Sequence, residues 1–277
     1  MGTSEASKGP NPGVSFDPPW LNDEGGFEPT DLPPPAESNN NGEAISGEDP
    51  LLAPPARFRN ARTWIGKYAR ESSGRTGFQK AAGHYSKTGM GGSGKLANRM
   101  RYSTATGARL AQFLGSTASQ NDSTVNTWVN DIVERGLSGQ TLIDAIIQQV
   151  APSSGSRDEE SCADSMAEAL GEFLENHENE NLLELDTGEI REITESFIAN
   201  EACNRMTNDI GQIFERENVS LKESLSLLTE MREFLREDLS VQIESLWKVT
   251  ANPTQPQLDQ ILRSSIERTF RVYEGEL

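Results

Sequence analysis

The sequence predicts an all-α protein, a helical bundle preceded by a long disordered N-terminal arm rich in Pro and Gly. Three observations support this prediction. Eleven of the fourteen prolines lie before residue 56, whereas apolar residues after residue 57 recur at the three- and four-residue spacing of helices. No segment alternates apolar and polar residues over enough positions to require a strand. Charge divides the chain in the same way: residues 1–50 carry ten acids and one base, residues 51–112 one acid and twelve bases, and residues 113–277 thirty-two acids and twelve bases.

Residues 1–56 form the expected arm. They include the Pro33–Pro35 and Asn39–Asn41 runs and almost no apolar periodicity, a composition typical of extended, unfolded chain. Gly2 is small enough for Met1 to be removed, but Ala6 stands where the myristoylation pattern needs Ser or Thr. An α-amino group has a pKa of about 7.7–8.0, against about 10.4 for lysine, so the freed terminus is a better nucleophile near neutral pH than a lysine side chain.

Residues 57–152 are expected to be a basic, glycine-interrupted helical region. Ala61, Trp64, Ile65 and Tyr68 fall on one face of a first helix over 57–70. Seven glycines between residues 74 and 94 predict short helices joined by turns. Further helices are expected from 96 to 114, 125 to 134 and 142 to 150. The apolar residues of the second of these predict its buried face: Trp128, Val129, Ile132 and Val133.

Residues 153–277 are expected to be an acidic helical bundle with helices over 157–177, 187–217, 220–249 and 255–274. Two of these helices begin with capping boxes, at Asp186 and at Ser220. A short extended piece is possible at 182–185. Leucines at heptad spacing favour a bundle core over a two-stranded zipper, because further apolar residues widen the stripe; these leucines are Leu221, Leu225, Leu228, Leu235, Leu239 and Leu246.

No catalytic, cofactor or metal site is predicted, so the chain is not expected to be an enzyme. Residues 89–96 nearly match a phosphate-binding loop, but Leu96 replaces the hydroxyl that ligates magnesium and no strand precedes the loop. The two histidines and two cysteines form no recognisable motif. Cys162 and Cys203 are expected to be buried, reduced thiols.

The basic block over 57–109 has the composition of a nucleic-acid surface, with Arg99 and Arg101 among twelve bases interleaved with aromatic residues. The alternative, which we favour, is that acidic residues elsewhere in the chain or in another subunit neutralise it. The sequence shows no secretory signal and no run of eighteen apolar residues, so a cytoplasmic protein without a membrane segment is expected.

The leader MGTSEASKGP, the segment from Asp17 to Leu21 and the blocks YSKTGMGGS and KLANRM resemble the QatB family of the four-component Qat anti-phage defence system. The resemblance covers the leader and residues 57–115, whereas the acidic half matches only in being helical. It implies a non-enzymatic protein acting beside an ATPase (QatA), a QueC-like deazaguanine enzyme (QatC) and a TatD-like nuclease (QatD).

The resemblance further implies that the QueC-like partner joins a deazaguanine to the amine of Gly2. Thr3 and Ser4 would then enter the partner's pocket. Pro18, Pro19 and Trp20 would be a docking anchor, although Trp20 could equally hold the arm against the helical body. Two further functions stay open: a nucleic-acid adaptor using Arg99 and Arg101, and a scaffold of the defence complex.

Overall fold

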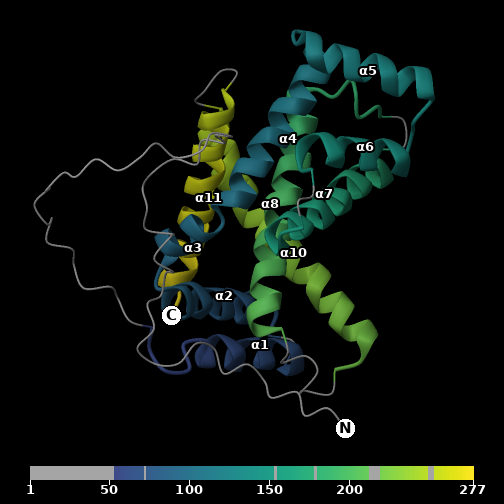
Figure 1. The fold of residues 1–277 in the computed structure, drawn as a ribbon. Coiled ribbons are helices and arrows are strands. Elements are labelled where there is room, and N and C mark those ends of the chain that lie inside the picture. Colours follow the sequence, from purple (N-terminus) through teal and green to yellow (C-terminus); the bar gives the residue numbers. More distant parts are fainter. Residues whose placement is uncertain (1–52, 72, 153–154, 178–179, 212–218, 249–252) are drawn as a thin grey trace, which may run out of the picture. The chain divides into compact units, whose positions relative to one another are not determined.

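The computed structural model describes residues 53–277 except 72, 153–154, 178–179, 212–218 and 249–252, and these described residues form helices and no strands (Figure 1). The all-α prediction is confirmed. The arm predicted for residues 1–56 lies almost wholly outside the described residues.

The basic region begins with α1 (Arg59–Glu71) and α2 (Gly74–His84), which pack against each other. A π-helical turn, η2 (Tyr85–Met90), continues α2 and leads into α3 (Ser93–Arg99) and α4 (Arg101–Ser119). As predicted, Ala61, Ile65 and Tyr68 of α1 are buried, and Trp64 is half-buried. α2, α3 and α4 all pack against the C-terminal helix α11 (Gln255–Gly275).

The prediction that glycines break this region into short helices is only partly right. Gly77, Gly83 and Gly89 lie inside helices and are buried. A Cβ atom at Gly83 would lie 2.3 Å from the backbone oxygen of Tyr273, so this glycine permits α2 and α11 to approach closely. The turn itself is made by Gly91 and Gly92, whose φ angles are 83° and 113°.

α5 (Ser123–Arg135) and α6 (Gln140–Val150) follow α4. The predicted buried face of α5 is right at Ile132, partly right at Trp128 and Val129, which are half-buried against the core, and wrong at Val133, which is 64 % exposed. Trp128 packs edge-on against Phe113 of α4, with 5.0 Å between ring centroids. α5 thus packs on α4 through a narrow part of its surface, and Ile132 is its one fully buried residue among those that the structure describes.

The acidic half consists of α7 (Arg157–Asn176), α8 (Thr187–Ile210), α10 (Leu221–Trp247) and α11. The capping boxes at Asp186 and Ser220 are confirmed, and α7 and α11 have further ones at Ser156 and Thr254. α8 is the central helix, since α4, α7 and α10 all pack on it. The extended piece expected at 182–185 is a turn whose three leucines are buried.

The leucine stripe of α10 enters the core only in its second half. Leu235 and Leu239 are fully buried, together with Met231 and Ile243, whereas Leu221 is 78 % and Leu225 57 % exposed. The bundle prediction is therefore right for the second half of α10 and wrong for its first two turns.

Residues Phe58–Leu277 form one unit with a shared core. Helices from both sides of the boundary predicted at residue 152 pack on each other, because α4 contacts both α8 and α11 (Figure 1). The division into a basic region over 57–152 and an acidic bundle over 153–277 stays a prediction.

Candidate functional site

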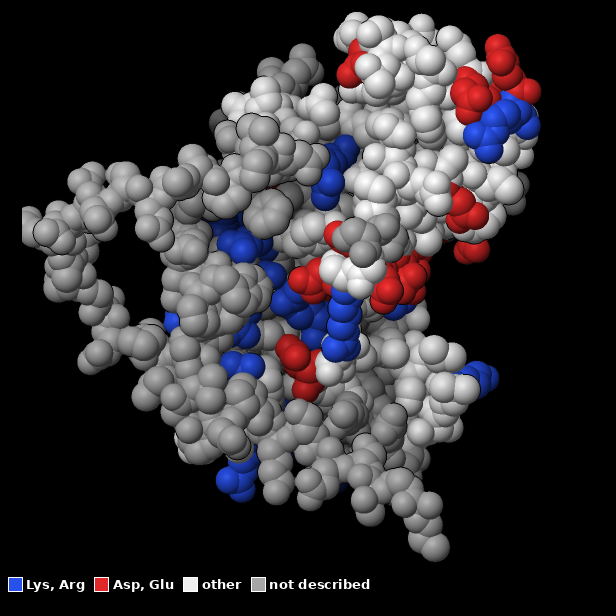
Figure 2. All heavy atoms as spheres, in the orientation of Figure 1, with Lys and Arg blue, Asp and Glu red and all other residues white. Residues whose placement is uncertain are grey.

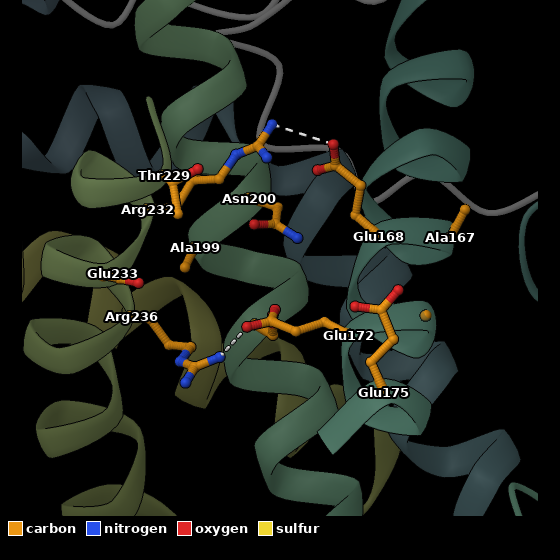
Figure 3. Close-up of a pocket in the computed structure, with 12 residues that line it drawn as sticks. Ala167, Glu168, Glu172, Glu175, Ala199, Asn200, Thr229, Arg232, Glu233 and Arg236 are labelled. Atoms are coloured by element: carbon orange, nitrogen blue, oxygen red, sulfur yellow. Dashed lines mark hydrogen bonds and ion pairs between the residues drawn. The ribbon is translucent and has the colours of Figure 1, made fainter. Parts of the chain in front are cut away.

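A polar groove of about 490 Å³ lies between α7, α8 and α10 (Figure 3). We call it the α7–α8–α10 groove. Four glutamates and two arginines line it, with small residues between them. Its lining residues are Ala167, Glu168, Gly171, Glu172, Glu175, Ser196, Ala199, Asn200, Thr229, Arg232, Glu233 and Arg236. Small residues at 167, 171 and 199 leave the space that larger side chains would fill.

Two ion pairs join the walls of the groove. Arg236 of α10 donates to Glu172 of α7 over 2.6 Å, and Ser196 of α8 donates to the other oxygen of Glu172 over 2.8 Å. One turn away, Arg232 pairs with Glu168 over 3.2 Å. Both arginines of the groove are therefore already engaged with carboxylates (Figure 3).

Asn200 lies between these pairs with its amide group toward the groove (Figure 3). Its side chain is one of the few buried polar groups of α8, and only 5 % of the residue is exposed. Unlike Ser196, it makes no hydrogen bond to any of the residues that the structure describes.

A hydrogen-bond network that begins in the core at Glu201 reaches Arg232 in the wall of the groove. Glu201 of α8, 4 % exposed, accepts from Ser103 of α4 over 2.6 Å and from Ser161 and Ser165 of α7 over 2.8 Å and 2.7 Å. Ser165 also accepts from Asn204 over 3.0 Å, and Asn204 accepts from Arg232 over 3.3 Å. The network thus runs from the core to the wall of the groove.

The two cysteines are buried and free, as predicted. Burial raises the pKa of the Cys203 thiol to about 11, and burial together with the neighbouring Glu201 raises the pKa of Cys162. Both thiols are thus protonated near neutral pH and are poor nucleophiles. Among the residues that the structure describes, no three His, Cys, Asp or Glu side chains come together as a metal site.

The basic block is only partly available to a nucleic acid. Figure 2 shows Lys and Arg side chains around α3, with acidic side chains beside them. Tyr68, Phe78 and Tyr85, three of the aromatic residues interleaved with these bases, are buried and so offer no stacking surface to a nucleic acid. The ring of Trp64 is covered by two lysine amines, those of Lys67 and Lys80, at 4.3 Å and 4.7 Å from its centroid.

One base of this block, Arg75, and two of its buried tyrosines, Tyr68 and Tyr85, contact acids of α8 and α10. Arg75 pairs with Glu237 and Asp238 of α10, and the hydroxyl of Tyr85 donates to Asp209 of α8 over 2.8 Å. Arg99 and Arg101 are half-buried, and Arg99 contacts the sulfur of Met90 at 3.1 Å. Their role in binding nucleic acid stays a prediction.

The remaining predicted site residues lie outside the described part of the chain: Gly2, Thr3, Ser4, Pro18, Pro19 and Trp20. The sequence reasoning did not find the α7–α8–α10 groove. Two signals pointed to it. Glu168, Glu172 and Glu175 follow helical spacing on one face of α7, and Arg232 and Arg236 do so on α10.

No helix within the described ranges has both the length and the apolar character needed to cross a bilayer. No curated protein and no solved structure matches the chain. A family model described as "QatB: Qat anti-phage system associated protein QatB" matches residues 91–273. The match extends through the acidic half, where the resemblance by motif consisted only of helical character, and it includes neither the leader nor residues 57–90. Because this match covers well over half of the sequence, from α3 into α11, the chain belongs to the QatB family.

Proposed function

We propose that this component of the Qat anti-phage system is a non-enzymatic protein whose N-terminal amine, on Gly2 after removal of Met1, accepts a deazaguanine from a QueC-like partner, QatC. The observation that carries the proposal is the position of Gly2 directly behind Met1, at the start of an acidic, proline-rich leader in a QatB-family chain. Family membership supports the defence role, and the chemistry of the terminus supports the acceptor role.

The reaction we propose is amide formation. The QueC-like partner would activate the carboxylate of a deazaguanine with ATP, forming an acyl adenylate and releasing pyrophosphate. The neutral amine of Gly2 then attacks the acyl carbon, AMP leaves with the electron pair of the broken bond, and the amine loses a proton. A pKa of about 7.7–8.0 leaves a sizeable neutral fraction of this amine near pH 7.5, whereas lysine amines are almost fully protonated.

The helical body supports a substrate or scaffold role better than a catalytic one. Its two thiols are buried with raised pKa values, and its main groove has both arginines engaged in ion pairs. We propose that Thr3 and Ser4 follow Gly2 into the partner's pocket and that Pro18, Pro19 and Trp20 dock beside it. We place the protein in the cytoplasm, acting with QatC, the ATPase QatA and the TatD-like nuclease QatD, with no membrane partner.

Intact-mass and N-terminal peptide mass spectrometry test the proposal on full-length protein made with and without the QueC-like partner. The expected result is an adduct on Gly2 only when the partner is present. A Gly2→Leu variant, which keeps Met1 because leucine is too large for its removal, should carry no adduct on residue 2. Unmodified des-Met protein in the presence of active partner would refute the proposal.

A nucleic-acid adaptor is the second candidate, supported by the charge of the basic block. It predicts binding of DNA or RNA that weakens steeply with salt and is lost in an Arg99→Glu/Arg101→Glu variant. The burial of Tyr68, Phe78 and Tyr85 removes the stacking part of that interface. A pure scaffold differs again, since deleting residues 2–16 should then leave defence intact.

A further inference from the structure

Three lysines of the α1–α2 hairpin and the turn that follows it have no acid partner. Lys67 lies on α1, Lys80 on α2 and Lys87 in η2, and none of them forms an ion pair with a residue that the structure describes. In a chain with 43 acidic residues against 25 lysines and arginines, a group of cations that meets no carboxylate is notable. By contrast, Arg75 near the start of α2 pairs with two acids of α10.

Trp64 holds two of these lysines together. α1 and α2 pack side by side (Figure 1), and the ammonium nitrogens of Lys67 and Lys80 lie 4.3 Å and 4.7 Å from the centroid of the Trp64 ring. The ring attracts both cations, and this attraction offsets part of their mutual repulsion. Two ammonium groups thus gather around one indole ring although they belong to different helices.

The imidazole of His84 is affected by this positive charge. His84 follows Lys80 by one turn of α2, and burial, together with the positive charges of Lys87 and Lys80, lowers its pKa. The Nδ1 atom of His84 is buried and has no hydrogen-bond partner in the described part of the chain, so no described carboxylate neutralises this end of the hairpin. The positive charge is therefore left for an anion from another molecule.

The arrangement of these groups favours an acidic protein segment over a nucleic acid. The ring of Trp64 is occupied by ammonium groups, so a base stacks on it only after displacing them. A nucleic acid also extends beyond the three lysines, toward a body whose residues 113–277 carry thirty-two acids against twelve bases, and these acids repel a long polyanion. A short acidic segment contacts the lysines alone, and its carboxylates suit ammonium groups, which carry three rotatable N–H donors each.

We infer that the surface formed by Lys67, Lys80 and Lys87 around Trp64 is a docking site for an acidic segment of a partner protein. Carboxylates of the segment pair with the ammonium groups, two of which stay in contact with the indole ring. We call this surface the α1–α2 lysine face. It does not include the bases of α3 and α4, and the inference does not depend on the N-terminal amine proposed above.

Titration of the full-length protein with the peptide acetyl-Gly-Glu-Glu-Gly-Glu-Glu-Gly-amide tests the inference, followed by calorimetry and by NMR of the histidine rings. The control peptide carries glutamine in place of every glutamate. The chain has two histidines, so His177 at the end of α7 serves as an internal control for His84. The expected result is saturable binding that weakens with salt, shifts the ring resonances of His84 and not those of His177, and is absent for the glutamine peptide.

Two double variants with the same charge change separate the α1–α2 lysine face from the overall charge of the chain. Lys67→Gln/Lys80→Gln should weaken the acidic peptide about tenfold, as expected for the loss of two surface ion pairs at the upper end of their usual strength. Arg135→Gln/Lys248→Gln, at exposed positions on α5 and at the end of α10, should leave the affinity within about twofold.

Circular dichroism checks that the variants fold. Lys87→Gln, at an exposed position, should weaken the acidic peptide about threefold by itself, so the inference stays testable if the double variant at the half-buried lysines unfolds. Equal weakening by both double variants, equal binding of the glutamine peptide, or no binding at all overturns the inference. It is also overturned if a short DNA duplex binds more tightly than the peptide and loses this binding in Lys67→Gln/Lys80→Gln.

Discussion

Ser103 of α4 donates a hydrogen bond over 2.6 Å to Glu201 of α8, a carboxylate that is 96 % buried at the junction of three helices. Ser161 and Ser165 of α7 also donate to Glu201, as does the thiol of Cys162 over 3.5 Å, so one acid connects α4, α7 and α8. This arrangement satisfies a carboxylate in the core by hydroxyl donors, with no ion pair to Glu201 among the described residues. A buried acid is tolerable only while such donors remain in place.

Glu201→Ala should destabilise the fold by about 3 kcal/mol, because it leaves the buried hydroxyls of Ser103 and Ser165 without this acceptor and opens a cavity. Glu201→Gln keeps the volume and one acceptor oxygen, and should cost about 1 kcal/mol as the hydroxyls reorient. Urea unfolding followed by circular dichroism measures both. An alanine variant as stable as the parent would show that Glu201 does not hold the three helices together.

Gly83→Ala should cost about 2 kcal/mol, although alanine is the better helix former, because its Cβ would lie 2.3 Å from the backbone oxygen of Tyr273. Gly171→Ala is the matched control. It also lies inside a helix, α7, but nothing approaches its position within 4 Å, so it should stabilise the fold by about 0.5–1 kcal/mol. Opposite signs of the two changes in melting temperature are expected, and a shared sign would contradict the close approach of α2 and α11.

Elements fixed by local interactions were predictable from the sequence. The helices of the acidic half begin within one residue of the expected positions because each has a capping residue whose effect depends only on its neighbours, as at Asp186 and Ser220. Gly77, Gly83 and Gly89 were wrongly predicted to interrupt helices. A Cβ atom at Gly83 or Gly89 would clash with a residue from another part of the chain, and the sequence around each glycine does not reveal such a neighbour.

The site residues were harder to predict for the same reason. Exposed glutamates on α7 and arginines on α10 are each ordinary surface residues, and only the packing of both helices on α8 turns them into the walls of one groove. Asn200 becomes notable only when its burial is known. The buried face of α5 was overestimated because an amphipathic pattern predicts which side faces the body and not how closely the body approaches it.

The two halves of the α10 leucine stripe should respond very differently to truncation. Leu239→Ala removes a fully buried side chain and should cost about 2–5 kcal/mol. Leu225→Ala, at a position 57 % exposed, should change stability by no more than about 0.5 kcal/mol. Denaturant unfolding of both variants measures the contrast. A large loss at Leu225 would show that this turn is covered in solution, for example by a second copy of the chain.

Stability should fall as pH rises through the titration of Glu195. Burial, with the neighbouring Glu192 and Glu244, raises the pKa of this carboxyl from 4.5 to about 7, even though Arg191 lies 3.4 Å away. Between these two pH values the folded state binds more protons than the unfolded state, so folding is favoured at the acid end of the window and loses about 2 kcal/mol by pH 8, after allowance for partial solvent screening.

Glu195→Gln removes this titration and isolates its contribution. The variant should match the parent near pH 5 and exceed its stability by about 2 kcal/mol at pH 8, because the glutamine amide never acquires the buried charge that the parent acquires. Glu134→Gln on the exposed face of α5 serves as the control and should show no such divergence with pH. Unfolding curves at pH 5, 6, 7 and 8 measure the difference. If the two curves of Glu195→Gln and parent ran parallel across this range, the carboxyl of Glu195 would already be ionised at pH 5 in the folded protein.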